Sequence, residues 1–217
     1  YTFDANGVMA PYTGIIGDKF YRDGELVKAY QVVEYNGNYY FVSDAHKLAK
    51  NAVIYMGAQF LKNTGMPEGY YSFDAEGVMR PYTGIIMGRF YYKDAVMVKA
   101  YKVIEHEGYY YFIYDGNCFA TDCALFVSAQ FLTGTNLTPG YYTFDSKGRL
   151  SGTVTGLYDG KYFIDGVQQN AYQVVSYGGN YYFISDGNRM AVNTTMYLTD
   201  KFVGSFGLKA DYYCFDA

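Results

Sequence analysis

The sequence contains no tryptophan and few prolines, histidines and cysteines. Its 217 residues include 4 Pro, 3 Cys and 2 His, against 29 Tyr, 16 Phe and 25 Gly. Three cysteines (Cys118, Cys123 and Cys214) cannot form a complete set of disulfides. We expect Cys118 and Cys123 to lie along one strand, about 16 Å apart and beyond disulfide reach. Without histidines at ligand spacing they do not form a metal motif either, so we interpret them as small, partly buried apolar residues.

An excess of basic residues is also missing. Lys and Arg number 17 against 21 Asp and Glu, which gives a formal net charge of −4. Nucleic acids and anionic membrane surfaces are bound through clustered positive charge, so neither is expected as a partner. No apolar run approaches the roughly 20 residues that span a bilayer. The chain starts at Tyr1 in the middle of a repeated pattern, and we expect it to be a piece of a longer protein.

Catalytic and metal-binding motifs are absent as well. The histidines, His46 and His106, belong to no metal or nucleophile motif, and no DxDxDG-like calcium loop occurs. The recurrent Asp4, Asp74 and Asp145 precede turn residues, where an Asp side chain caps its own backbone. A glycosidase needs two carboxylates across a cleft about 5 to 10 Å wide, which stacked hairpins do not offer. The sequence therefore predicts a protein that is not an enzyme and has no cofactor or metal.

Aromatic β-hairpins are what the sequence does contain. The stretch 36–55, NGNYYFVSDAHKLAKNAVIY, opens with an Asn-Gly turn signal and continues with strong strand formers. Strand alternation places Tyr39 and Phe41 on one face, and Tyr40 and Val42 on the other. Both faces are therefore apolar. Since a free hairpin cannot bury both, each hairpin is expected to stack on its neighbours.

The hairpins belong to a longer repeat. The motif YTFDANGVM (1–9) returns as YSFDAEGVM (71–79), YTFDSKGRL (142–150) and YCFDA (213–217), and a fixed period of about 70 residues is typical of repeat architectures. The predicted fold is an all-β solenoid of stacked β-hairpins built from three repeats of about 70 residues. It forms a single elongated domain (1–217), divided into repeat 1 (1–70), repeat 2 (71–141), repeat 3 (142–212) and the start of a truncated fourth repeat (213–217).

Each repeat is expected to contain two short hairpin units and one long unit. The turn after the aromatic strand of stretch 36–55 reads Asp-Ala-His at 44–46. The corresponding turns of the other two repeats read Asp-Gly-Asn, at 115–117 and 186–188. Helix is disfavoured over 45–61, because the corresponding segment of repeat 2 has poor helix propensity. The second part of the long unit, within 52–70, holds Gly and Pro and is predicted to be a loop or an extra short strand pair.

Several units resemble a known group of repeats. GDKFYRDGELVKAY (17–30), DGKYFIDGVQQNAY (159–172) and GGNYYFISDGNRMAVN (178–193) share the order Gly, polar, two aromatics, a turn, then an apolar residue. This resembles the bacterial cell-wall-binding repeats, which include choline-binding repeats, streptococcal glucan-binding repeats and the repetitive oligopeptide repeats of clostridial toxins. The mixture of short and long units is most similar to the toxin arrangement.

The resemblance implies a hairpin solenoid on a secreted or cell-surface, wall-attached bacterial protein, which recognises carbohydrate or choline at the joints between units. Choline-binding repeats build their cation cages largely from Trp, and this chain has none. Tyrosine offers a weaker cation-binding face. This departure from the family pattern therefore favours a sugar over choline as the ligand.

Carbohydrate recognition needs flat apolar faces with polar groups beside them. In each repeat, the segment that leads into the aromatic strand at 39–42 or its counterpart combines Tyr with polar residues. They are Tyr30, Gln31, Glu34, Tyr35 and Asn38 in repeat 1, Tyr101, Lys102, Glu105, His106 and Tyr109 in repeat 2, and Tyr172, Gln173, Ser176, Tyr177 and Asn180 in repeat 3. The alternative is that these tyrosines pack between hairpins with their hydroxyls at the rim.

The long unit offers a second set of candidates, which the resemblance to the toxin repeats favours because their long unit participates in the sugar site. The set comprises Tyr55, Gln59 and Phe60, then Phe126, Gln130 and Phe131, then Tyr197, Lys201 and Phe202. The alternative is that these side chains fill the core where a short hairpin meets a long one.

The predicted function is a non-catalytic module that binds cell-wall or host glycan, with weak sites between hairpins that gain strength through multivalency. The alternatives are a structural spacer or stalk, and a protein-binding adhesin segment without a small ligand. Exposed aromatics beside polar partners would favour binding, whereas fully packed ones would favour the stalk. Oligomers are expected only through the trimmed repeat ends, where hairpin edges are unpaired.

Overall fold

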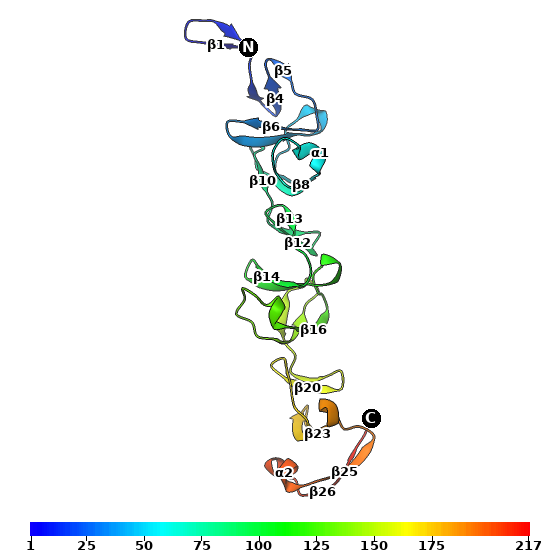
Figure 1. The fold of residues 1–217 in the computed structure, drawn as a ribbon. Helices are drawn as coiled ribbons and strands as arrows, with labels where there is room; N and C mark the ends of the chain where they lie inside the picture. The colour runs from blue at the N-terminus through cyan, green and yellow to red at the C-terminus, as the bar shows by residue number, and fades with distance from the viewer. The chain divides into compact units, whose positions relative to one another are not determined.

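The computed structural model describes residues 1–217 and consists of small antiparallel sheets (Figure 1). Each sheet is made of two or three strands that follow one another in the sequence. The prediction of an all-β protein made of β-hairpins is therefore confirmed. The contacts divide the chain into two compact units, Tyr1–Lys99 and Ala100–Ala217, which are described separately. The predicted repeat boundaries remain a prediction.

Three short three-stranded sheets have the same construction. Their second turn has two residues with positive φ, for example Asp23 (φ 51°) and Gly24 (φ 83°), as the tight turns that match strand twist require. The sheets are β3 (Gly14–Ile16), β4 (Lys19–Arg22) and β5 (Glu25–Leu26); β11 (Gly84–Ile86), β12 (Phe90–Lys93) and β13 (Val96–Met97); and β19 (Gly156–Tyr158), β20 (Lys161–Ile164) and β21 (Val167–Gln168).

Three longer hairpins, called the central hairpins below, follow the short sheets, and each ends in a single 3₁₀ turn. They are β6 (Gln31–Tyr35) and β7 (Asn38–Val42) with η1 (Asp44–His46); β14 (Lys102–His106) and β15 (Tyr109–Ile113) with η2 (Asp115–Asn117); and β22 (Gln173–Tyr177) and β23 (Asn180–Ser185) with η4 (Asp186–Asn188), after which β24 (Arg189–Met190) pairs with β23. The predicted reversal of the chain at 44–46, 115–117 and 186–188 is thus present.

The remaining strands form the long hairpins and the N-terminal hairpin. They are β1 (Thr2–Phe3) and β2 (Met9–Ala10); β8 (Ala52–Met56), β9 (Gly69–Phe73) and β10 (Met79–Pro81); β16 (Cys123–Val127), β17 (Gly140–Phe144) and β18 (Leu150–Thr153); and β25 (Thr194–Leu198) and β26 (Asp211–Phe215).

A short helical turn connects the first two strands of each long hairpin. These turns are α1 (Ala58–Leu61), η3 (Ala129–Phe131), and α2 (Asp200–Val203) followed by η5 (Gly204–Phe206). The prediction that disfavoured helix over 45–61 was therefore wrong for residues 58–61, whereas residues 62–68 after α1 form the predicted loop. The helical conformation is stabilised by the burial of one apolar side chain at the end of each turn. Leu61, Leu132 and Val203 are 3%, 5% and 1% exposed.

Both faces of the central hairpins are buried, as the alternation of side chains predicted. On one face of β7, Phe41 joins a cluster with Met56 and Tyr71. On the other face, Tyr40 and Val42 join a separate cluster that the short hairpin before it helps to form. Burying each large apolar side chain contributes about 1.5 to 3 kcal/mol, so packing on both faces is what stabilises this hairpin.

The three cysteines are free, and the prediction that Cys118 and Cys123 share a strand was wrong. Cys118 follows η2, whereas Cys123 begins β16, and Asp122 between them has a left-handed backbone (φ 48°) that turns the chain. Cys123 is half-buried, and this burial raises the pKa of its thiol.

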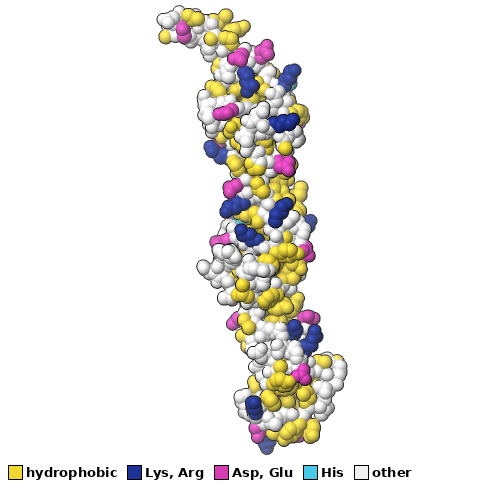
Figure 2. Space-filling view, in the orientation of Figure 1, with side chains coloured by type: hydrophobic (Ala, Val, Ile, Leu, Met, Phe, Trp, Pro, Cys, Tyr) yellow, Lys and Arg dark blue, Asp and Glu magenta, His cyan; other side chains and the backbone are white.

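Charged side chains of both signs are interspersed on the surface. In Figure 2 the Lys and Arg side chains lie among Asp and Glu, with no patch of one sign on the visible face of either unit. One exposed ion pair joins Lys47 to Asp18 at 2.9 Å, and the guanidinium of Arg149 lies 4.2 Å from the centre of the Tyr109 ring. No helix in the structure has the length and apolar character needed to cross a membrane.

Candidate functional site

A tyrosine and an aspartate are hydrogen-bonded at the open end of each central hairpin. The Tyr hydroxyl donates to the Oδ1 atom of the Asp in Tyr30–Asp44, Tyr101–Asp115 and Tyr172–Asp186, which we call the Tyr–Asp pairs. Each Tyr directly precedes the first strand of the hairpin, and each Asp opens the 3₁₀ turn after the second strand. Because the two strands are antiparallel, these positions meet at one end of the hairpin.

The carboxylate of each pair holds its phenol in the neutral form. The hydrogen bond to Asp44 raises the pKa of Tyr30, since ionisation would place two negative charges side by side. Hydrogen bonds to Asp115 and Asp186 likewise raise the pKa of Tyr101 and of Tyr172. At neutral pH each site therefore presents a neutral donor already engaged with the carboxylate of an exposed Asp, and a carboxylate can accept further hydrogen bonds.

The rings of the paired tyrosines are exposed although their hydroxyls are held. Tyr30, Tyr101 and Tyr172 are 55%, 44% and 58% exposed. Tyr30 and Tyr172 also have a left-handed backbone, both with φ 65°. Non-glycine residues in this region carry strain of order 1 to 3 kcal/mol and are found mostly where the surrounding structure enforces them, often at functional sites.

The helical turn of the next long hairpin adds an aromatic wall to two of the sites. The ring of Phe60, from α1, is 6.5 Å from the Tyr30 ring at an angle of 32°. The ring of Phe131, from η3, is 5.7 Å from the Tyr101 ring at 30°. Tyr114 adds an edge-on ring 5.7 Å from Tyr101, so the second site has the largest aromatic surface.

The third site has the same pair but a different wall. Phe202, from α2, packs against Phe183 at 5.5 Å, as Phe60 and Phe131 pack against the central hairpins in the other copies, but its ring makes no ring contact with Tyr172. The Lys201 Nζ lies 5.8 Å from the Phe202 ring. Ser185 stands where the second copy has Tyr114, and Lys201 stands where the other copies have Gln59 and Gln130. The third site therefore exchanges aromatic surface and a neutral amide for a positive charge.

The backbone leading into each Tyr is fixed by the turn that carries the Asp. The N–H of Ala100 donates to Asn117 Oδ1 at 2.9 Å, and the N–H of Ala171 donates to Asn188 Oδ1 at 2.7 Å. In the first copy His46 takes the place of these asparagines, and its Nδ1 is buried without a hydrogen-bond partner. In the second and third copies, two side-chain hydrogen bonds therefore join the ends of the hairpin, one from the Tyr hydroxyl to Asp and one from the preceding N–H to Asn.

The structure separates the members of the first predicted set. Tyr30 and Tyr35 lie at opposite ends of β6, about 16 Å apart by strand rise. Tyr35 packs edge-on against Phe20 at 5.6 Å, and Tyr177 packs against Tyr162 at 6.1 Å, as the packing alternative proposed. The polar members lie along β6, β14 and β22: Gln31, Glu34, Lys102 and Glu105 are exposed, while Gln173 and His106 are half-buried.

The second predicted set is divided between two places. Phe60 and Phe131 join the Tyr–Asp pairs, with Gln59 and Gln130 exposed beside them. By contrast, Tyr55 packs at 5.3 Å against Tyr70, which packs at 4.7 Å against Tyr92 of the following short sheet. Phe126 and Tyr197 make the corresponding contacts with Tyr141 and Tyr212, at 5.4 and 5.2 Å.

Sequence reasoning missed the aspartates of the pairs. Asp44, Asp115 and Asp186 were interpreted as turn residues, which they also are. The signal that identifies them is their constant separation of 14 residues from the exposed tyrosine in all three copies. Each site has one carboxylate, and no group of three or more His, Cys, Asp or Glu side chains could hold a metal ion. The chemistry on offer is an aromatic face with a hydrogen-bond acceptor.

Comparison with known proteins finds similarity only at the level of structure. No protein-family model and no curated protein matches the chain. Among solved structures, 62 chains match. The modular autolysin LytC of Streptococcus pneumoniae, solved with a synthetic peptidoglycan ligand, has a TM-score of 0.37 and 13% identity, over 77% of this chain and 34% of that chain.

Two further structures have similarly low TM-scores and sequence identities. Choline-binding protein F of Streptococcus pneumoniae, solved with a peptidoglycan analogue, has a TM-score of 0.31 and 19% identity, over 82% of this chain and 57% of that chain. Alternansucrase in complex with isomaltononaose has a TM-score of 0.30 and 12% identity, over 86% of this chain and 17% of that chain. This chain thus spans less than two thirds of each. Solved choline-binding proteins are among the structures to which it is similar, as the sequence resemblance predicted.

Proposed function

We propose that the chain is a non-catalytic carbohydrate-binding module of a bacterial surface or secreted protein, and that it binds a glycan of the cell wall or of a host surface. The Tyr–Asp pair carries this proposal. An exposed tyrosine, hydrogen-bonded to the carboxylate of an exposed Asp, recurs three times in the chain. Each such site offers the two kinds of contact that a sugar needs.

The apolar face of a pyranose would lie on the exposed ring of Tyr30, Tyr101 or Tyr172, with Phe60 or Phe131 as a second wall. A sugar hydroxyl would donate to the free oxygen of the paired Asp, which is a charge-assisted and therefore stronger hydrogen bond. The exposed amides of Gln59 and Gln130 supply a donor and an acceptor on the adjoining helical turn.

The pairs also lower the entropic cost of binding. The hydrogen bond to Asp fixes the tyrosine hydroxyl, and the left-handed backbone of Tyr30 and Tyr172 fixes the direction of the side chain before a ligand arrives. Ordering a flexible side chain on binding otherwise costs about 0.5 to 1.5 kcal/mol. A small, shallow site benefits most from this saving because its total binding energy is low.

Repetition compensates for the weakness of a single shallow site. A polysaccharide with many identical sugars can engage several pairs at once, so that overall affinity exceeds that of one site. The alternative function is a spacer or stalk without a ligand. The exposure of the three paired rings, between 44% and 58%, favours binding, because rings that served only to pack hairpins together would be buried.

A glycan array probed with the whole chain, displayed multivalently, tests this proposal. The array should include peptidoglycan fragments, α-glucan oligosaccharides and host glycans, with immobilised choline as a separate arm. We expect binding to a defined glycan that falls at least about 10-fold in the triple variant Tyr30→Ala, Tyr101→Ala and Tyr172→Ala, while the circular dichroism spectrum stays unchanged.

The matched control is the double variant Tyr1→Ala and Tyr181→Ala, which removes exposed tyrosines outside the pairs and should bind as the unaltered chain does. Equal losses in both variants would mean that general aromatic surface, not the pairs, carries binding. If the unaltered chain bound no glycan, the proposal would be overturned in favour of a spacer. If it bound immobilised choline alone, the ligand would be a cation and not a sugar.

A further inference from the structure

The turn at 145–149, beside the second central hairpin, carries a positive charge that its counterpart in the first copy lacks. It reads Asp-Ser-Lys-Gly-Arg, whereas the turn at 74–78 reads Asp-Ala-Glu-Gly-Val. Two acidic residues are thus replaced by one acidic and two basic residues. The backbone is the same in both, because the Asp carboxylate accepts two N–H groups of its turn in each copy. The difference therefore lies in the chemistry of the side chains.

Arg149 lies against the second strand of this hairpin. Its backbone forms a β-bridge with Tyr111 of β15, as Val78 does with Tyr40 of β7. Its guanidinium lies 4.2 Å from the centre of the Tyr109 ring, a distance at which the face of a ring attracts a cation. Hydrogen bonding to Tyr111 raises the pKa of Arg149, so the guanidinium stays charged. Two tyrosines therefore hold this cation in place.

The residues next to the hairpin turn differ together with the arginine. In each central hairpin one residue pair of the two strands lies directly beside the turn. These pairs are Tyr35 with Asn38 in the first copy, Tyr177 with Asn180 in the third, and His106 with Tyr109 in the second. In the second copy the tyrosine has thus moved to β15, the strand that Arg149 contacts. Differences that are far apart in the sequence meet at one place, which points to a shared role.

Arg149 has a charge that the chain leaves unpaired. Neither ion pair of the chain includes it. Asp145 acts on the guanidinium only at longer range, and its Oδ1 accepts the N–H groups of Lys147 and Arg149 at 2.9 and 2.8 Å. Arg149 is half-buried, whereas the other arginines are exposed, and its Nε is buried without a hydrogen-bond partner. Charged groups that are withdrawn from water are normally paired, so this guanidinium lacks an anionic partner.

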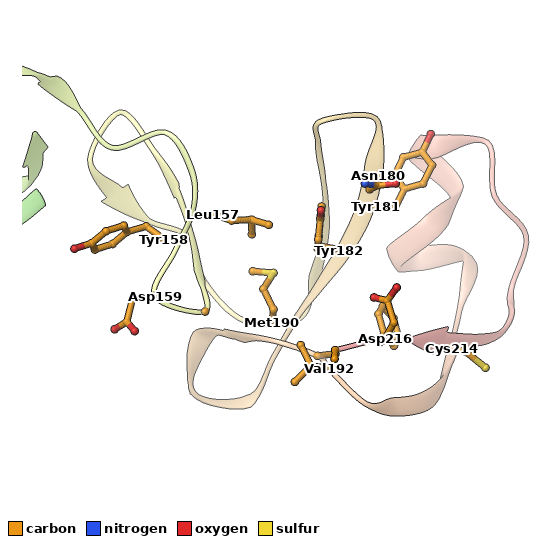
Figure 3. A pocket seen from close by; sticks show the side chains of 14 residues that line it. Leu157, Tyr158, Asp159, Asn180, Tyr181, Tyr182, Met190, Val192, Cys214 and Asp216 are labelled. Atoms are coloured by element: carbon orange, nitrogen blue, oxygen red, sulfur yellow. The ribbon is translucent and has the colours of Figure 1, made fainter.

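The same face of the third central hairpin has no such charge. Figure 3 shows Tyr182, the counterpart of Tyr111, in an open groove of about 890 Å³, with Asn180 in the place of Tyr109. Aspartate side chains line this groove, and no Lys or Arg does. An anion would be repelled there. Of the three copies, the second alone offers a cation held on a tyrosine ring.

We propose that Arg149, with Lys147 beside it, binds an oxyanion, namely a carboxylate or phosphate group of a ligand, at the turn end of the second central hairpin. A guanidinium presents its N–H donors in a planar fork that fits two oxygens of such a group. The Tyr109 ring fixes the orientation of the fork, and at 46% exposure this tyrosine leaves the place open to solvent. Lys147 is exposed and adds a second positive charge.

This site is separate from the Tyr–Asp pair of the same hairpin. Tyr109 begins β15 beside the hairpin turn, whereas Asp115 follows the other end of that strand. The five residues of β15 place the two sites about 16 Å apart. Oxyanion binding at Arg149 therefore does not depend on glycan binding at the pairs, and each can be lost without the other.

NMR titration of the whole chain, followed through the arginine Nε–H signals, tests the proposal. The probes are inorganic phosphate, glucuronate and, as a neutral sugar, glucose, all at constant ionic strength. We expect phosphate or glucuronate to shift the Arg149 signal along a saturable curve with one site per chain and a Kd of order 1 mM, and glucose to leave it unchanged. A lower Kd for glucuronate would identify an acidic sugar as the ligand, and a lower Kd for phosphate a phosphate group.

The variant Arg149→Val gives the second copy the residue that the first copy has at this position, where Val78 shows that valine fits. Binding, now followed through the backbone N–H signals of 145–149, should weaken at least about 10-fold. The matched control Arg80→Gln removes an exposed arginine of β10 and should bind as the unaltered chain does. A loss of equal size in the control would mean that general positive charge, and not this site, attracts the anion.

Transfer of the site to the first copy is the decisive measurement. The variant that combines Tyr35→His, Asn38→Tyr, Glu76→Lys and Val78→Arg should bind two anions per chain, with an unchanged circular dichroism spectrum. One anion per chain in this variant, with the fold retained, would overturn the proposal. The absence of any saturable shift in the unaltered chain would overturn it too, and would leave glycan binding at the Tyr–Asp pairs untouched.

Discussion

The turn at 44–46 and the turn at 115–117 follow the same path with different residues. Both place two residues in the left-handed region: Ala45 (φ 56°) and His46 (φ 57°) in the first, Gly116 (φ 68°) and Asn117 (φ 60°) in the second. Glycine adopts this conformation at no steric cost and Asn tolerates it, whereas Ala does not favour it. The Asn117 amide also accepts the N–H of Ala100, while the His46 Nδ1 is buried without a partner.

The Tyr–Asp pair is nevertheless present in both copies. The position of the pair is therefore set by the paired strands, which bring the two ends of the hairpin together, and not by the side chains of the turn. The turn residues decide how firmly that end is held. The strands thus determine the geometry of the site, and the turn residues determine its stability. Substitutions in the turn can therefore change the stability without changing the geometry.

The largest effect is expected when the second turn is given the sequence of the first. Gly116→Ala with Asn117→His places Ala in a left-handed conformation and removes the acceptor of the Ala100 N–H. We expect the free energy of unfolding to fall by about 2 to 5 kcal/mol, the sum of the two penalties. Denaturant unfolding and hydrogen exchange at Ala100 measure it, and an unchanged exchange rate at Ala100 would contradict the assignment of that hydrogen bond.

The reverse change should stabilise the first turn. Ala45→Gly with His46→Asn relieves the left-handed alanine and supplies an acceptor like that of Asn117, so the free energy of unfolding should rise by about 1 to 2 kcal/mol. The single variant His46→Asn separates the two contributions. A loss of stability would show that the His46 ring makes packing contacts that outweigh its unpaired nitrogen.

A smaller effect is expected on ligand binding when the aromatic wall is moved. Tyr114→Ser removes the ring beside Tyr101, and Ser185→Tyr places one beside Tyr172. We expect affinity for the glycan to fall about 2- to 10-fold at the second site and to rise comparably at the third, as the energy of one ring contact implies. Titration calorimetry on chains in which the two other sites carry Tyr→Ala resolves each site, and opposite signs are required.

The smallest effect is on stability at alkaline pH. The pKa of Tyr172 is raised above its ordinary value of 10.0 by the hydrogen bond to Asp186. Its contribution to stability is therefore complete below about pH 10 and is lost as the pH rises through the raised value. The thermal midpoint of the unaltered chain should exceed that of Tyr172→Phe at about pH 8, and the difference should shrink progressively as the pH rises above about 10. A difference that stays constant while Tyr172 ionises, followed by its ultraviolet absorbance, would exclude the hydrogen bond as its cause.

Periodicity in the sequence was enough to predict hairpins and buried faces. The alternation of Tyr39 to Val42 determined which residues enter which core, because side chains of a strand can only point to one of two faces. The helical turn at 58–61 escaped prediction, since four residues carry no periodic signal and the turn is stabilised by the burial of Leu61. Tertiary contact, not local propensity, decided its conformation.

The candidate site was predicted in part for a similar reason. Tyr30, Tyr101 and Tyr172 were chosen from their chemistry, and Phe60 and Phe131 from the long unit. Their meeting at one place depends on the register of a hairpin and the docking of a helical turn, which adjacency in the sequence does not reveal. Neighbours in the sequence, such as Tyr35, instead lie a full strand length away.

The burial of both faces of the central hairpins has a consequence for how such a chain can change in length during evolution. Phe41 belongs to one core and Val42 to another, so the loss of the hairpin β6–β7 would open two cores at once. A deletion is tolerated only if the hairpins on either side can meet with matching faces, which requires removal of a complete period. Genes for chains of this kind should therefore grow and shrink by unequal crossing-over in whole repeats, and intermediate lengths should be rare.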